Sequence, residues 1–102
     1  MDDLKETKQS LSELWALLRK KEQKFGLNKL SLTERDIFQL ILHLQNKNLN
    51  IKLDVIIKNC NYPRATLFRS LKKLRSNNFI EIFKDKADTR KSIIKTAEQF
   101  RN

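Results

Sequence analysis

The stretch YPRATLFRSLKKLRSNNFIEIFKDKADTRKSIIKT, residues 62–96, decides the fold. Its first half predicts a helix over about residues 63–77, because Pro63 suits the first helical position and an asparagine pair follows the last leucine. Two strand-like runs come next, residues 79–84 and 91–95, with a charged loop between them. That loop lacks the Asn-Gly or Asp-Gly pair of a tight turn, so we expect a longer connection. The chain therefore ends in a helix and a two-stranded hairpin.

The predicted helix has one apolar face and one basic face. At 100° per residue, Leu67, Leu71 and Leu74 form a narrow stripe, which indicates the buried side. The far side is small or basic, and residues 63–77 include no acid. A solvated helix usually mixes both signs to gain i, i+4 pairs, so this face indicates a negatively charged partner. Phe68 lies between the faces, where it either packs at the domain edge or contacts a thymine methyl group.

Positive charge is concentrated in the same part of the chain. The net charge is +10, and from Tyr62 onward eleven Lys and Arg stand against four Asp and Glu. Such a field favours DNA, RNA or an acidic membrane surface as partner, although a protein can also be lysine-rich without one. Double-stranded DNA fits best, because a basic helix enters a major groove and a basic hairpin reaches the adjacent backbone or minor groove.

Several classes of function are not expected. One cysteine and one histidine provide neither a disulfide nor a typical zinc site, so no metal or cofactor is predicted. The sequence has no glycine-rich phosphate loop, no histidine beside a nucleophile and no carboxylate cluster, so we assign no catalytic residue and expect no enzyme. No apolar run is long enough for a membrane span and the first residues are acidic, so we expect a cytoplasmic protein. Cys60 is interpreted as a small core residue.

A long helix is predicted at the N-terminus, over about residues 2–25, with Gly26 as its left-handed end. Leu4, Leu11 and Leu18 recur every seven residues, with Leu14 and Trp15 between them. These five residues predict a homodimer through this helix; the alternative is a helix that lies on its own domain. We accordingly divide the chain into residues 1–28, a dimerisation element, and residues 29–102, a DNA-binding domain.

The middle of the chain predicts further elements. Thr33 is expected to cap a second helix, which ends over residues 46–48 and whose buried stripe holds Ile37, Leu40, Ile41 and Leu44. A short strand over residues 49–51 and a third helix over residues 52–59 follow. Asn61 is expected to supply a left-handed turn before the basic helix. Residues 96–99 predict a capping box for a last helix.

This order of elements resembles the winged helix-turn-helix of the MarR/SarA family of bacterial transcription regulators. The resemblance rests on Leu32-Thr33-Glu34, on residues 56–67, on Leu74 followed by residues 77–80, and on Asp88-Thr89-Arg90. It covers roughly residues 30–97. Asn78 stands where the family usually has glycine, and Ser70 replaces an apolar residue. The two long C-terminal helices of the family are missing, which argues against its usual dimer and the small-molecule effector pocket beside it.

The resemblance implies a mainly α-helical protein with a small β-hairpin wing and a long N-terminal helix. It further implies a sequence-specific transcriptional regulator, most simply a repressor. The helix over residues 63–77 would lie in the major groove, and the wing over residues 84–91 would lie on the backbone or minor groove. Arg90 would reach the minor groove with Asp88 orienting it, unless the two only brace the wing turn.

The residues expected to contact DNA are predicted to lie on the exposed side of the basic helix or on the wing. They are Arg64, Ala65, Thr66, Arg69, Lys72, Lys73, Lys84, Lys86, Arg90 and Lys91. Arg64 and Arg69 are the candidates for specificity, because arginine reads guanine with two hydrogen bonds. The lysines expected mainly to supply phosphate charge are Lys72, Lys84, Lys86, Lys91 and Lys95. The alternatives are a plasmid or phage replication or partition protein that binds DNA, and a winged-helix module that binds another protein. RNA is disfavoured, since no aromatic pair is expected on an exposed strand.

Overall fold

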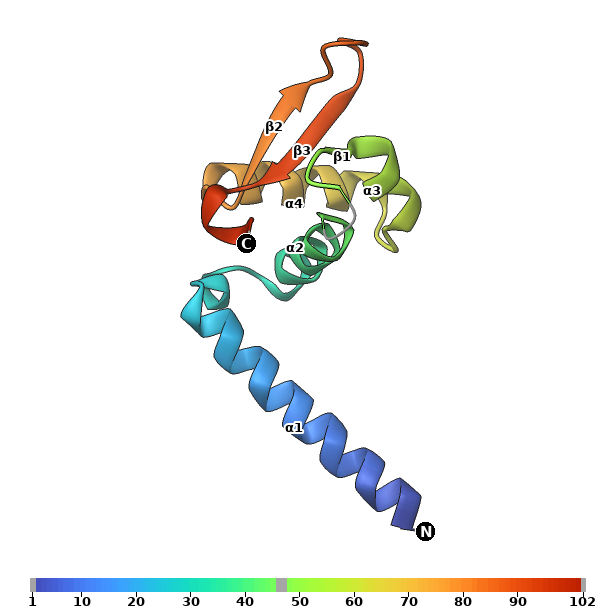
Figure 1. Ribbon diagram of the computed structural model, residues 1–102, viewed down its shortest axis with the longest axis vertical. Coiled ribbons are helices and arrows are strands. Elements are labelled where there is room, and N and C mark those ends of the chain that lie inside the picture. The colour runs from blue at the N-terminus through green and yellow to red at the C-terminus, as the bar shows by residue number, and fades with distance from the viewer. Residues whose placement is uncertain (1, 46–47, 102) are drawn as a thin grey trace. The chain divides into compact units, whose positions relative to one another are not determined.

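The computed structural model describes residues 2–45 and 48–101, and the chain divides into two compact units, Met1–Ser31 and Leu32–Asn102. The first unit consists of helix α1, Asp2–Lys24, and the 3-10 helix η1, Leu27–Lys29 (Figure 1). Gly26 joins them with φ of 77°, which confirms the predicted left-handed helix end. Leu27 and Leu30 are buried directly after that turn.

The second unit contains three helices, three short strands and a final 3-10 helix. These elements are α2 Leu32–Gln45, β1 Ile51–Lys52, α3 Leu53–Asn59, α4 Arg64–Ser76, β2 Ile80–Lys84, β3 Ser92–Thr96 and η2 Glu98–Phe100. The strands form an antiparallel sheet in the order β1-β3-β2, with Ile94 of β3 opposite both Ile51 and Ile82. The expected fold class is confirmed: a mainly helical winged helix whose hairpin gains β1 as a third strand. No helix within the described ranges is both long and apolar enough to cross a membrane.

The core of the second unit lies where α2, α3 and α4 meet the sheet. Its fully buried side chains are Ile37, Phe38, Ile41, Ile56, Leu67, Leu74, Ile94 and Thr96. An aromatic cluster closes one side of it: the ring centroid of Phe38 lies 5.4 Å from that of Phe79 and 5.0 Å from that of Phe100. The stripe predicted for α4 is confirmed. That of α2 is confirmed for Ile37 and Ile41, whereas Leu40 and Leu44 are half-buried.

Two helix starts differ from the sequence prediction. The helix α2 begins at Leu32, so Thr33 lies in its first turn and is not its cap. The helix α4 begins at Arg64, and Pro63 is its N-cap with an extended ψ of 152°. The predicted end of α2 involves residues 46 and 47, which lie outside the described residues.

The left-handed residue near α4 stands at its end and not at its beginning. Among the described non-glycine residues only Asn78 has a positive φ, 64°, so the expectation for Asn61 is wrong. The amide of Asn78 donates to the carbonyl of Arg75 at 3.1 Å, and the amide of Phe79 donates to the carbonyl of Leu74 at 2.9 Å. These two bonds form a Schellman motif, which ends α4 and directs the chain into β2.

The expected capping box at residues 96–99 is wrong. Thr96 is the buried last residue of β3, and its hydroxyl donates to the side-chain carbonyl of Gln45. The Gln45 amide in turn donates to the carbonyl of Phe100 at 2.6 Å. Because the threonine hydroxyl is used for this tertiary contact, it does not cap a helix, and only the short η2 follows.

Candidate nucleic-acid interface

The helices α3 and α4 form a helix-turn-helix through residues 60–63, and two side chains hold that turn. The side-chain amide of Asn59 donates to the carbonyl of Val55, four residues earlier, at 2.8 Å and so folds back onto the end of α3. The hydroxyl of Tyr62 donates to the Asp36 carboxylate at 2.9 Å and so ties the turn to α2. This bond favours the neutral phenol and raises the pKa of Tyr62 above 10. Cys60 is half-buried beside Tyr62, so its assignment to the core holds only in part.

The two faces of α4 lie as the leucine stripe predicts. Leu67, Leu71 and Leu74 are 1%, 3% and 0% exposed, and Ser70 is buried beside them. The exposed residues of the other face are Arg64, Ala65, Arg69, Lys72, Lys73 and Arg75, while Thr66 is half-buried. Within the described part of the chain, none of these five basic side chains forms an ion pair. Their charge is therefore available to a partner.

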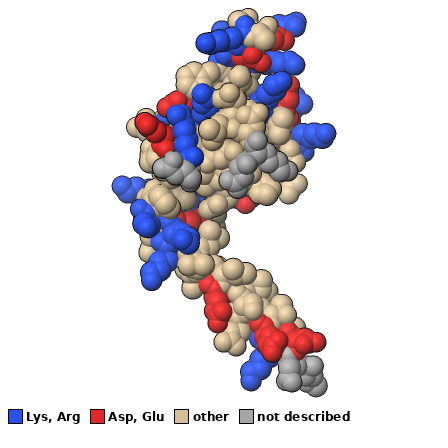
Figure 2. Space-filling view, viewed as in Figure 1, with Lys and Arg blue, Asp and Glu red and all other residues tan. Residues whose placement is uncertain are grey.

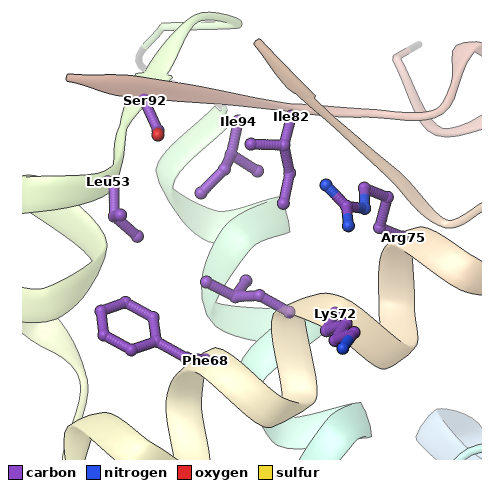
Figure 3. A pocket seen from close by; sticks show the side chains of 8 residues that line it. Leu53, Phe68, Lys72, Arg75, Ile82, Ser92 and Ile94 are labelled. Atoms are coloured by element: carbon purple, nitrogen blue, oxygen red, sulfur yellow. The ribbon is translucent and has the colours of Figure 1, made fainter. Parts of the chain in front are cut away.

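Arg75 is a basic residue of this face that the sequence reasoning did not include among the contacts. Like Phe68 and Lys72, it lines a groove of about 210 Å³ between α3, α4 and the sheet. Leu53, Ile82 and Ile94 point into this groove from the opposite sides (Figure 3). Its position, 80° from Leu67 around the helix, places it at the edge of the basic face, so the helical period alone did not single it out.

Phe68 is 44% exposed and lies at the edge of the groove, opposite Leu53 (Figure 3). The structure thus places this ring at the boundary between the packed and the exposed side of α4. Contact with a thymine methyl group remains a prediction for it.

The wing consists of β2, β3 and the connection over residues 85–91. The amide of Asp85 donates to the carbonyl of Lys91 at 2.9 Å, which closes the loop. The carboxylate of Asp88 accepts the Arg90 amide at 3.1 Å, the Arg90 Nε at 3.1 Å and the Arg90 Nη2 at 3.3 Å. These bonds hold the pKa of Asp88 below its ordinary value of 3.8. Asp88 thus both braces the turn and fixes the direction of the Arg90 side chain.

Four of the five wing cations named from the sequence are exposed: Lys84, Lys86, Arg90 and Lys91. Figure 2 shows Lys and Arg side chains over the wing, with acidic side chains among them. Lys95 differs, because it is half-buried and its Nζ lies 5.7 Å from the ring centroid of Phe83. Phe83 is itself exposed on β2, so one aromatic residue stands on this strand.

The residues predicted for dimerisation are exposed along α1. Leu4, Leu11, Leu14 and Trp15 are each 61–63% exposed and Leu18 is 44% exposed. Among the described residues, no three His, Cys, Asp or Glu side chains gather into a metal site.

Comparison with known proteins supports the fold through structure alone. No protein-family model and no curated protein matches the chain. The crystal structure of MarR matches with a TM-score of 0.59 and 21% identity over 88% of this chain. The fold is a MarR-type winged helix. Reduced AbfR bound to DNA has the same fold, with a TM-score of 0.59 and 21% identity over 98% of this chain.

A third such structure is BpsR of Bordetella bronchiseptica, whose DNA binding is regulated by 6-hydroxynicotinic acid, with a TM-score of 0.57 and 18% identity over 88% of this chain. The chain spans 66% of the MarR chain, 68% of the AbfR chain and 65% of the BpsR chain.

Proposed function

We propose that this protein is a sequence-specific double-stranded DNA-binding transcriptional regulator that acts as a repressor in the cytoplasm, with no catalytic step. The observation that carries the proposal is the exposed face of α4, whose five basic side chains form no ion pair with any residue of 2–45 or 48–101, while its leucines are buried. The MarR-type fold supports it, because AbfR has this fold and is bound to DNA.

The helix α4 is proposed to lie in the major groove. Arg64 and Arg69 would read base edges, since a guanidinium donates two parallel hydrogen bonds to guanine. Lys72 and Lys73 would neutralise phosphates on either side, and Arg75 joins them because it is equally exposed. Phosphate contacts fix the register of the helix, whereas base contacts supply the specificity.

The wing is proposed to lie on the backbone or in the minor groove. Lys84, Lys86 and Lys91 would supply phosphate charge. An arginine side chain carries five N–H donors, and Arg90 donates two of them to Asp88. The remaining donors are free in a side chain that is 89% exposed, so Arg90 is held in place for a minor groove.

A homodimer through α1 is part of the proposal. Two copies related by a two-fold axis would read two half-sites of a pseudo-palindrome, about 34–36 Å or a multiple of that apart. We include no small-molecule effector.

Selection of bound sequences from random duplex DNA, followed by gel shifts at several salt concentrations, tests the proposal. An enriched palindrome is expected, with a slope of log affinity against log salt near about −5 if about six phosphates are neutralised. A flat salt dependence would contradict the electrostatic basis. An enriched array of direct repeats would instead favour the replication or partition alternative.

A further inference from the structure

The helix α1 presents an apolar face, and the charges along the helix indicate how a second copy covers it. We propose that α1 pairs with α1 of a second copy in the antiparallel direction. This inference rests on the proposed homodimer, to which it adds the orientation and the facing residues.

Most large apolar residues of α1, together with Phe25 directly after it, form one stripe along the helix, and Leu17 at −140° from Leu4 lies outside it. Taking Leu4 as 0°, Leu11, Leu14, Trp15, Leu18 and Phe25 all fall between −80° and about +20° at 100° per residue. The exposure of these side chains is 44–63%, which is unusual for so many large apolar groups on one face. A stripe of this width and length fits another helix of the same length.

Charge is divided unevenly along α1. Residues 3–13 contain three acids and two lysines, whereas residues 19–24 contain four cations and one acid. That acid, Glu22, pairs with Arg19 of the same helix at 3.0 Å. The C-terminal end of α1 therefore has a net positive charge. Figure 2 shows acidic side chains near the start of α1 and Lys and Arg near its end. A parallel pair would bring two cationic ends together, whereas an antiparallel pair sets each one beside an acidic end.

Lys21, at −100° and so at the edge of the stripe, argues against a parallel pair. It follows Leu14 by seven residues, so an in-register parallel pair would place it against Lys21 of the other copy. Like charges that face each other across a helix pair are destabilising. In an antiparallel pair Lys21 does not face its own copy: with Leu14 opposite Trp15 it is level with Lys8 of the other copy and two residues from Glu6, so both signs of charge lie near it.

The apolar residues also match in the antiparallel direction. When Leu14 of one copy faces Trp15 of the other, Leu11 faces Leu18 and Leu4 faces Phe25. Each large apolar residue then meets another one, and the polar residues of the stripe fall between these layers. The burial of apolar area thus drives association, and the distribution of charge selects the antiparallel direction of the two helices.

Cysteine bridging of the full chain in a C60S background tests the direction. A disulfide needs Cα atoms about 4.4–6.8 Å apart. In the antiparallel pair the two copies of residue 4 lie roughly 30 Å apart along the axis, whereas residue 4 lies beside residue 25 of the other copy. We expect no bridge in L4C alone and a heterodimeric bridge when L4C is mixed with F25C carrying a size tag.

A matched control mixes Q9C with K20C. These two positions lie at the same level along the antiparallel pair, but both side chains are on the outer side of α1, away from the other helix. No bridge is expected between them. Efficient bridging of L4C with itself would overturn the inference and leave a parallel homodimer. A monomer in sedimentation, with no bridge in any mixture, would overturn both the inference and the homodimer. A gel shift of the same samples with the selected duplex then tells whether the DNA-binding proposal survives.

Discussion

The helices α1 and α4 both carry leucines at helical spacing, yet the structure treats them differently. In α4 the leucines are buried against the rest of the second unit and the charged residues are exposed. In α1 the leucines themselves are exposed. A leucine stripe therefore indicates that a helix has a packing face, but the stripe alone does not tell whether the same chain or another one covers it. The distribution of charge distinguishes the two helices, because only α4 lacks acids altogether.

The largest expected effect concerns the leucines themselves. Leu74→Ala should lower the free energy of unfolding by about 2–5 kcal/mol, because Leu74 is fully buried and its truncation leaves a cavity. Urea denaturation followed by far-UV circular dichroism measures the change. The matched variant Leu14→Ala removes the same atoms from a site that is 61% exposed.

For Leu14→Ala we expect a change of less than about 0.5 kcal/mol in dilute, monomeric samples. In concentrated samples the variant should dissociate more readily than the parent chain, which the emission of Trp15, the one tryptophan, reports. Equal destabilisation by both substitutions in dilute samples would show that the stripe of α1 is covered within its own chain.

The second effect compares cations on the two helices. Arg69→Ala on α4 should cost about 1–3 kcal/mol in binding to the selected duplex and should relax discrimination between sequences. Lys8→Ala on α1 changes the net charge by the same amount and should have a much smaller effect on affinity. Fluorescence anisotropy with the selected and a scrambled duplex measures both. An equal loss on the two duplexes would make Arg69 a phosphate contact.

Much of the second unit could be predicted from the sequence, because local patterns and tertiary packing agree there. The leucine stripe of α4 and its basic far side were readable from a single helical period. The end of α4 was readable too, because Asn77-Asn78 follows the last turn and asparagine tolerates a positive φ.

The errors arose where a polar residue has two possible partners. Thr96 looked like a helix cap, but its hydroxyl is used by Gln45, which is distant in sequence. Asn61 was expected to be left-handed, while Tyr62 and Asn59 hold that turn through side-chain bonds instead. The groove beside Phe68 depends on contacts among α3, α4 and the sheet, which no local pattern reports.

A smaller effect compares the ends of the two helices, since α1 is followed by a left-handed glycine and α4 by a left-handed asparagine. Gly26→Ala should destabilise the end of α1 by about 1 kcal/mol, because alanine is strained at a φ of 77°. The added Cβ meets no atom within 4 Å, so no steric clash adds to this cost. Asn78→Gly should stabilise the second unit by up to about 1 kcal/mol, since glycine adopts a φ of 64° without strain. Thermal unfolding of the two variants measures the changes, and a loss of stability in Asn78→Gly would mean that the asparagine side chain holds the turn.

The smallest effect lies in the wing, where Arg90 is paired with Asp88, whereas the cations of α4 have no ion-pair partner among the described residues. The pKa of Asp88 is lowered by the side chain and then by the amide of Arg90, so the carboxylate should titrate below pH 3.8. A lowered folded-state pKa stabilises the protein above the unfolded value of about 3.9, and this contribution is lost as pH falls through the folded value. The pairing of Asp88 with Arg90 should therefore be intact from pH 5 to 8. Carbon-13 chemical shifts of the Asp88 carboxylate measure the midpoint of its titration. Arg90→Ala should move that midpoint upward towards 3.8 while keeping the loop closed through Asp85 and Lys91, whereas an unchanged midpoint would show that the backbone amide alone sets it.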